Sequence, residues 1–226
     1  MSGLRERQKT TRHRDILAAA EYLFRRDGFR ATGIEAIAAR ANLATGTLYN
    51  YFPSKGDILL ALVALDGEEV RAAGAKLIAR PPRDPETAIT RLLEIYIEHS
   101  LVHLTKDEWR HALANYFLQP DSRFGQGYAA LDGKLAAQVC ELVSALQSRG
   151  SLSPDIDSES AGRLLFYLCN SEFTLFVANE AMPMAELKQR MSRQIAIVMS
   201  GLERKAAPLA EAAAPPRLHR RPRKAA

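Results

Sequence analysis

The sequence predicts an all-α protein with about nine helices along the chain. Apolar residues recur at the spacing of a helix face through most of its 226 residues. The strand signal, an alternating run of β-branched residues between turn residues, is absent from the sequence. Capping patterns and breaks that contain glycine or proline separate the apolar segments, and they indicate where the helices end.

The first predicted helix covers about residues 10–27, with Ile16, Ala20, Leu23 and Phe24 on one face. Gly28 follows it, as glycine commonly does at the end of a helix. Thr32-Gly33-Ile34-Glu35 has the pattern of a capping box, so a second helix is expected to start at Thr32. Asn42-Leu43-Ala44 then forms a short break.

A very short helix is predicted from Thr45, its cap, to Phe52, which precedes Pro53. A helix of this length is not stable alone. Leu48 and Phe52 lie four residues apart, so they are expected to pack it against the preceding helix. Ser54-Lys55-Gly56-Asp57 has a second capping pattern, from which a longer helix is expected to reach about Ala79.

The segment Pro81–Pro85 is the clearest break in the chain. Further helices are predicted at about 86–104, 106–118, 127–149, 158–179 and 184–204, with loops at 120–127 and 150–157. We therefore divide the chain into a basic amino-terminal arm (1–13), a compact three-helix domain (14–53), a helical body (54–205) and a disordered basic tail (206–226).

The composition, with 47% apolar and 25% charged residues, is that of a soluble globular protein. The net charge of +5 is concentrated at the two ends, which are either solvated or in weak, salt-sensitive contact with nucleic acid. Cys140 and Cys169 lack the spacing of a metal or redox motif. No signal peptide or membrane-spanning segment is visible, so a cytoplasmic protein is expected. No cofactor is predicted.

A helix, a tight turn and a short second helix form the pattern of a helix-turn-helix. With Leu48 and Phe52 buried, the opposite surface of the short helix carries hydroxyl, amide and phenol groups, which suit base edges in the major groove. Gly46 allows a close approach of the backbone to DNA. Lys55 and Thr32, each at the start of a helix, are expected to contact phosphates.

Residues 16–60, ILAAAEYLFRRDGFRATGIEAIAARANLATGTLYNYFPSKGDILL, resemble the DNA-binding domain of the TetR family of transcriptional regulators. The stretch GTLYNYFPSKGDIL is the most specific part of this resemblance. The resemblance implies that Thr32, Tyr49 and Lys55 contact the phosphate backbone of DNA. It implies that Thr45, Gly46, Thr47 and Asn50 lie near base edges. Tyr51 is at a position that, in the family, contacts either the DNA backbone or a base. The alternative is that both tyrosines cover the core of the domain.

The resemblance also implies a carboxy-terminal domain that binds a ligand and forms a homodimer through the last two helices. The expected interface residues are Leu164, Leu168, Phe176, Met191, Ile195, Val198 and Leu202, which ordinary core packing would also explain. Candidate pocket residues are Tyr96, His99, His103, Trp109, Tyr116, Phe117, Phe124, Tyr128, Phe166, Cys169 and Phe173. His99 and His103 lie four residues apart, but no third ligand at a fixed offset is visible, so no metal site is predicted.

The expected function is that of a dimeric repressor, which a small apolar or aromatic ligand releases from a palindromic double-stranded operator. A DNA-binding protein that acts without a ligand, either architectural or activating, remains an alternative. An all-helical enzyme is the third possibility. The sequence shows no pairing of nucleophile and base, no phosphate loop and no paired metal motif that would support it.

Overall fold

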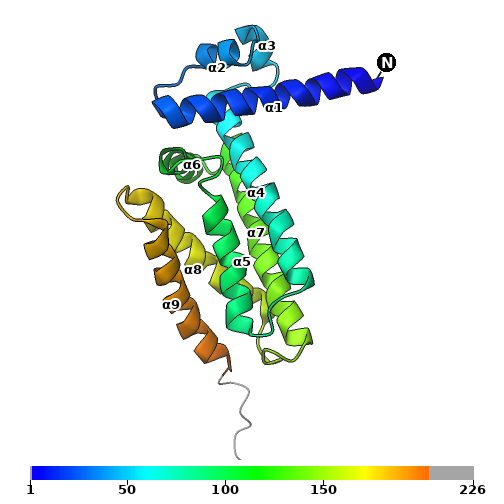
Figure 1. Ribbon diagram of the computed structural model, residues 1–226, viewed down its shortest axis with the longest axis vertical. Coiled ribbons are helices and arrows are strands. Elements are labelled where there is room, and N and C mark those ends of the chain that lie inside the picture. The colour runs from blue at the N-terminus through cyan, green and yellow to red at the C-terminus, as the bar shows by residue number, and fades with distance from the viewer. Residues whose placement is uncertain (1, 204–226) are drawn as a thin grey trace, which may run out of the picture.

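The computed structural model describes residues 2–203, with side chains from residue 6 to residue 201. Within this range the chain forms nine helices and no strand, which confirms the all-α prediction (Figure 1). The helices are α1 (Ser2–Asp27), α2 (Ile34–Arg40), α3 (Thr45–Tyr49), α4 (Lys55–Ala79), α5 (Pro85–His99), α6 (Lys106–Leu118), α7 (Arg123–Ser148), α8 (Ser158–Ala178) and α9 (Met184–Glu203). The predicted tail at 206–226 and the side chain of Leu202 lie outside the described residues.

The first three helices form a head at one end of the molecule, and the other six form a body (Figure 1). Helix α4 starts at the head and extends along the body beside α5 and α7. Helix α6 lies directly beneath the head, while α8 and α9 form one side of the body. None of the described helices is long and apolar enough to span a bilayer.

The head is held together by apolar side chains from all three of its helices. Ile16, Ala20, Leu23 and Phe24 of α1 are buried, as their spacing predicts. They share one core with Ile37 and Ala38 of α2, Leu48 of α3, and Phe52. Helix α3 has five residues, and Leu48 is its buried side chain. Burial of a leucine contributes about 1.5–3 kcal/mol, so tertiary packing rather than helix propensity holds this short helix.

Two predicted helix caps are wrong. Thr32 is buried and its hydroxyl donates to the carbonyl of Gly28 at 2.9 Å, so α2 begins after Gly33 without a side-chain cap. Ala44, rather than Thr45, is the N-cap residue of α3. The cap at Ser54 is confirmed, because its hydroxyl oxygen accepts from the backbone N–H of Asp57 at 3.1 Å.

Several predicted helix ends also move. Helix α1 begins at Ser2, so residues 2–13 of the predicted basic arm are part of this helix. Arginine, lysine, glutamine and glutamate continue a helix readily even where no apolar face requires it. Helix α5 ends at His99, and the chain turns before the capping box of Thr105 and Glu108 starts α6. Helix α7 begins at Arg123 rather than about residue 127, because Ser122 caps it.

Helices α7 and α8 approach closely at Gly162, which is buried against Cys140. A Cβ atom added at Gly162 would lie 2.5 Å from the Cα atom and 2.7 Å from the backbone nitrogen of Cys140. Only a residue without a side chain therefore permits this contact between the two backbones.

Candidate nucleic-acid interface and ligand cavity

The outer surface of α3 carries polar and aromatic groups. Tyr49 is 46% exposed, and Gly46 and Asn50 are also exposed. Thr45 and Thr47 are half-buried beside them. Tyr51 is half-buried and packs against the core, which fits the alternative in which this side chain covers the domain. The remaining groups can donate and accept hydrogen bonds, as contact with base edges and phosphates requires.

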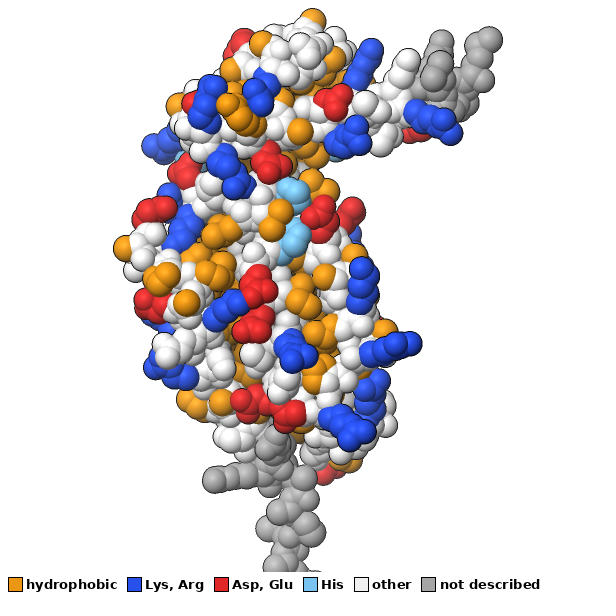
Figure 2. Space-filling view, in the orientation of Figure 1, with side chains coloured by type: hydrophobic (Ala, Val, Ile, Leu, Met, Phe, Trp, Pro, Cys, Tyr) orange, Lys and Arg blue, Asp and Glu red, His pale blue; other side chains and the backbone are white. Residues whose placement is uncertain are grey.

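Positive charge accompanies this surface on the head (Figure 2). Arg7, Lys9, Arg12 and Arg14 are exposed along the first half of α1, and Arg40 is exposed at the end of α2. The guanidinium of Arg40 lies 3.4 Å from the centre of the Tyr22 ring, and this cation–π contact holds the Arg40 side chain in place. Clustered exposed cations attract a polyanion by a sequence-independent, salt-sensitive force.

In the structure, the side chains of Lys55 and Thr32, the two predicted phosphate contacts, bond to carbonyls of the protein itself. The Lys55 ammonium donates to the carbonyls of Phe29 at 2.7 Å, Thr32 at 2.9 Å and Arg30 at 3.2 Å. These three bonds use all three of its protons, and burial lowers the pKa of the ammonium. Lys55 therefore holds the loop between α1 and α2 against α4, while the hydroxyl of Thr32 bonds to Gly28 within that loop.

A cavity of ≈ 70 Å³ lies in the body between α4, α5, α6, α7 and α8. Of the eleven predicted pocket residues, the structure brings six to its wall: Tyr96, Trp109, Tyr128, Phe166, Cys169 and Phe173. Sequence reasoning missed Val63, Asp66, Gly67, Val70, Ile97, Ser100, Leu131, Asp132, Leu135 and Asn170. Most of these lie on the inner faces of α4 and α7, where helical spacing marks burial but not the neighbouring cavity.

The other five predicted pocket residues lie away from the cavity wall. Tyr116 and Phe124 stack against Tyr128, with ring centres 5.0 and 6.3 Å from its own. Phe117 is 67% exposed at the end of α6. His99 and His103 lie near the surface at the junction of head and body.

Five titratable groups of the cavity wall have raised pKa values, and burial is the main cause for all of them, including the hydroxyls of Tyr96 and Tyr128. Burial raises the pKa of the Cys169 thiol to about 12, so this thiol is neutral and unreactive. Burial also raises the pKa of Asp132, although the hydrogen bond from Asn170 at 2.9 Å opposes the shift. The pKa of Asp66 is raised for the same reason, against the opposing contact with His99. The lining of the cavity is mostly aromatic and aliphatic, and it includes the carboxyl groups of Asp66 and Asp132.

The outward surfaces of α8 and α9 expose apolar side chains. Leu164, Tyr167 and Leu175 of α8 and Ile197 of α9 are between 46% and 72% exposed, and Leu168 and Val198 are half-buried. In contrast, Phe176, Met191 and Ile195 are buried within the chain. They were predicted as interface residues, but they are core residues of the single chain and cannot form its outer surface.

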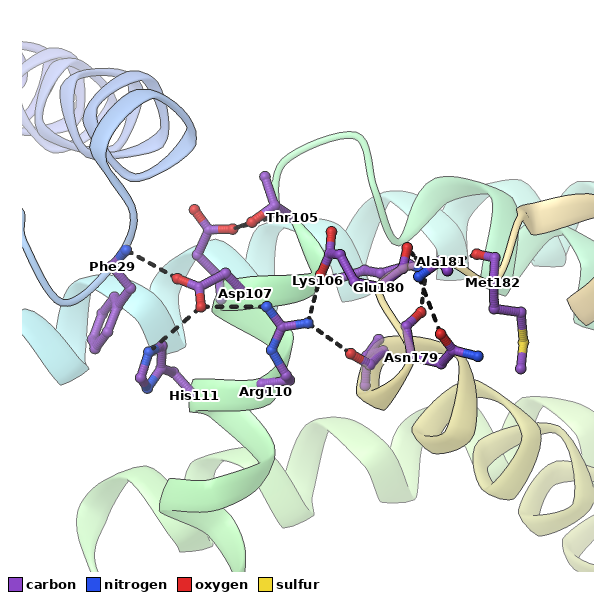
Figure 3. A network of polar contacts seen from close by, with 12 residues as sticks. Phe29, Thr105, Lys106, Asp107, Arg110, His111, Asn179, Glu180, Ala181 and Met182 are labelled. Carbon is purple, nitrogen blue, oxygen red and sulfur yellow. Dashed lines mark hydrogen bonds and ion pairs between the residues drawn. The ribbon is translucent and has the colours of Figure 1, made fainter.

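Helix α6 connects the head to the loop between α8 and α9 (Figure 3). On the head side, a carboxylate oxygen of Asp107 accepts from the backbone N–H of Phe29 at 3.2 Å. On the opposite side, Arg110 donates to the carbonyl of Val177 at 2.9 Å and pairs with Glu180 at 2.8 Å. Lys106 donates to the carbonyls of Asn179 at 2.8 Å and Met182 at 2.7 Å.

A helix-turn-helix head joined to an all-helical body with an internal cavity is the arrangement expected of a DNA-binding transcriptional regulator. Residues 16–62 match the family described as "Bacterial regulatory proteins, tetR family". The chain is 29% identical to the HTH-type transcriptional regulator UidR of Escherichia coli (strain K12) over 172 residues, which cover 74% of this chain and 82% of UidR. It is 40% identical to the HTH-type transcriptional repressor KstR of Rhodococcus jostii over 75 residues, 33% of this chain and 35% of KstR.

Among solved structures, the fold is similar to that of Thermus thermophilus FadR, a TetR-family transcriptional repressor in complex with lauroyl-CoA. The TM-score is 0.62 at 27% sequence identity, and the match covers 90% of this chain and 99% of FadR. The chain is thus similar to TetR-family transcriptional regulators, both in the sequence of its helix-turn-helix and in its fold as a whole.

Proposed function

We propose that the protein is a dimeric repressor that binds a palindromic operator through α3 and releases it when a small apolar or aromatic molecule occupies the cavity. The observation that carries this proposal is the exposed polar and aromatic surface of α3 on a head that is bonded to the body through α4 and α6. We also propose a cytoplasmic location, because the operator is chromosomal DNA.

The proposed DNA contacts are Thr45, Gly46, Thr47, Tyr49 and Asn50, with Tyr51 at the edge of the surface. Direct base readout would rest on the hydroxyl and amide groups of Thr45 and Asn50. The proposed roles of Thr32 and Lys55 are to position the head rather than to bind phosphate.

Replacing Gly46 with alanine is expected to weaken operator binding at least about tenfold, or 1.4 kcal/mol, without destabilising the protein. A Cβ atom at this position meets nothing within 4 Å in the free chain, so the lost affinity would report contact with DNA. Fluorescence anisotropy with labelled operator measures the affinity, and urea denaturation measures the stability. Gly133→Ala is the matched control, since its Cβ atom also meets nothing within 4 Å. Equal DNA affinity in G46A and G133A would contradict the proposed close approach.

We propose that the dimer forms through the exposed apolar surfaces of α8 and α9. Two copies of this surface would bury Leu164, Tyr167, Leu175 and Ile197, all of which are unfavourably exposed in the single chain. A dimer would place two α3 helices in successive major grooves of a palindromic site.

Replacing Leu175 with arginine is expected to convert the dimer to monomers, because it places an unpaired charge in an apolar interface. Sedimentation velocity measures the mass, and the affinity for the full palindrome should fall together with it. Val102→Arg adds the same charge at an apolar residue of similar exposure, 47% against 46%, outside α8 and α9. A dimeric L175R protein, or an equally monomeric V102R protein, would count against this interface.

The ligand would enter the cavity between α4, α5, α6, α7 and α8. FadR binds lauroyl-CoA, a molecule with an apolar chain, and the aromatic lining here supports an apolar or aromatic ligand. The cavity measures ≈ 70 Å³, whereas ligand pockets usually measure about 300–1,000 Å³. A ligand would therefore have to separate the surrounding helices, and this displacement supplies the difference between the two states that release of DNA requires.

We propose that α6 transmits this displacement. Trp109 of α6 lies in the cavity wall, while Asp107, two residues earlier, holds the N–H of Phe29 in the head. A ligand that moves Trp109 would thus move the support of the loop between α1 and α2.

Replacing Asp107 with alanine is expected to accelerate hydrogen exchange at the Phe29 amide by about 10- to 100-fold, because a bond to a charged acceptor contributes about 1.5–3 kcal/mol. Exchange measured by NMR or mass spectrometry tests this without a ligand. Asp121→Ala removes an exposed carboxylate from the loop between α6 and α7 and should leave the Phe29 amide unchanged. Unchanged exchange in D107A would show that Asp107 does not support the head.

Selection of DNA from a random pool by the purified protein tests the function as a whole. A palindromic consensus would support the specific dimeric regulator. Recovery of unrelated sequences, with binding that falls steeply as salt increases, would instead support the architectural alternative. Transcription from a promoter that carries the consensus would then distinguish repression from activation.

A further inference from the structure

A cluster of two histidines and three carboxylates lies at the junction of head and body. His99 ends α5, His103 follows in the turn before α6, Asp66 and Glu69 come from α4, and Glu21 comes from α1. Figure 2 shows pale-blue histidine side chains beside red acidic side chains just below the head. The cluster is separate from the α3 surface, and of its members Asp66 alone reaches the cavity wall.

One oxygen of Glu69 faces both imidazole rings. Glu69 Oε2 lies 3.0 Å from His99 Nε2 and 2.9 Å from His103 Nε2. One ligand atom from each of these three residues can be chosen so that all three lie within 4.8 Å of one another. The sequence could not reveal this group, because Glu69 comes from a different helix and has no fixed spacing from the histidines.

The second nitrogen of each ring faces another carboxylate. His99 Nδ1 lies 2.7 Å from Asp66 Oδ1, and His103 Nδ1 lies 3.3 Å from Glu21 Oε2. A carboxylate on one nitrogen holds that nitrogen as an N–H donor and leaves the other nitrogen free to bind a metal. This pairing of carboxylate and histidine is the usual support of a histidine that binds zinc.

The charges also favour a cation. Three carboxylates surround two imidazoles, and among the side chains that the structure describes, the arginine that pairs with them is Arg25, at 3.9 Å from Glu21. A divalent ion at the two Nε2 atoms would neutralise most of this negative charge.

We propose that Glu69, His99 and His103 form a binding site for a divalent transition-metal ion, best suited to Zn²⁺, with Asp66 and Glu21 as the carboxylates that orient the two histidines. Two imidazole nitrogens and one carboxylate oxygen are a known zinc ligand set, and they leave a fourth position for water or another ligand. Bonds of about 2.0–2.1 Å in a tetrahedral site place neighbouring ligand atoms about 3.3 Å apart. The observed separations of 2.9 and 3.0 Å from Glu69 Oε2 are close to this value, and the Glu69 side chain is 45% exposed and can adjust its position.

A zinc ion at this position would join α4 to the end of α5 and to the turn that follows it. Glu21, which orients His103, belongs to α1 of the head, so the ion would also restrain the head relative to the body. Zinc binding would thus be a second way to affect the contact between head and body, separate from ligand binding in the cavity.

The test is zinc binding by the full-length protein without an affinity tag, measured by competition with a chromophoric chelator. We expect one Zn²⁺ per chain and an increase in the thermal unfolding midpoint with zinc. Co²⁺ in the same site should give the visible absorption of a tetrahedral ion, without the near-ultraviolet band of thiolate ligands that Cys140 or Cys169 would add.

Variants distinguish zinc binding at this site from zinc binding by other side chains of the protein. Glu69→Gln and the double variant H99Q/H103Q are expected to weaken zinc binding by more than about 100-fold, and Asp66→Asn by about 10- to 100-fold. The chain has five histidines, so His13→Gln, His111→Gln and His219→Gln are matched controls that should retain full affinity. Because Glu69 is at the surface, E69Q remains informative even if the double variant is poorly folded.

Absence of saturable zinc binding, or equal affinity in E69Q and the wild type, would overturn the proposal. The measurement uses no DNA, so its failure would not affect the proposed repressor function. Conversely, a DNA selection that recovered no consensus would leave the zinc result unaffected.

Discussion

Replacing Leu48 with alanine is expected to lower the free energy of unfolding by about 2–5 kcal/mol and to abolish sequence-specific DNA binding, although the Leu48 side chain is fully buried. Leu48 is 0% exposed and is the buried side chain of the five-residue helix α3. Truncation would leave a cavity between α3 and the rest of the head, and so short a helix has no other source of stability. Urea denaturation followed by circular dichroism measures the first effect, and anisotropy with the selected operator measures the second.

Leu118→Ala is the matched control, because it makes the same chemical change at a leucine that is 79% exposed on α6. Its stability should stay within about 0.5 kcal/mol of the wild type, with unchanged DNA affinity. An L48A protein that unfolds at the wild-type urea concentration and still selects the operator would refute the packing described for α3.

Replacing Gly162 with alanine is expected to destabilise the body by about 1–3 kcal/mol, the usual cost of added volume in a packed core. The new methyl group would lie 2.5 Å from the Cα atom of Cys140. This neighbour is backbone and cannot rotate away as a side chain could, so α7 and α8 would have to separate. Thermal and urea denaturation measure the loss.

Gly133→Ala, in α7 itself, provides the comparison for this variant. Its methyl group meets nothing within 4 Å, and alanine is favoured over glycine in a helix by about 0.5–1 kcal/mol, so a small gain in stability is expected. If G162A were as stable as G133A, the close contact between α7 and α8 would be wrong.

The head was the most predictable part of the molecule. Leu48 and Phe52 could be identified as buried because four residues make about one helical turn, and both are buried. The cap at Ser54 was predicted from the carboxylate three residues later, and it is present. The same pattern failed at Thr32, whose hydroxyl bonds back to Gly28. A sequence shows that a threonine could cap the helix that follows it, but not whether its hydroxyl bonds to that helix or to a preceding carbonyl.

The body was less predictable for the same reason. Phe173 was predicted in the pocket and lines the cavity, whereas Phe176 was predicted in the dimer interface and is instead buried in the core of the single chain. The two histidines were expected in the pocket, and the structure instead places them beside Glu69 and Glu21 at the junction.

The sequence by itself determined the all-α class, the helix-turn-helix, the resemblance to the TetR family and the apolar face of each main helix. These features depend on contacts within a few residues, which helical periodicity and local capping rules describe. Only the tertiary structure decided that Lys55 holds three carbonyls, which aromatic side chains surround the cavity, and that Glu69 meets His99 and His103. Such contacts join residues that are distant in the chain, and they depend on how whole helices are placed, which no short spacing encodes.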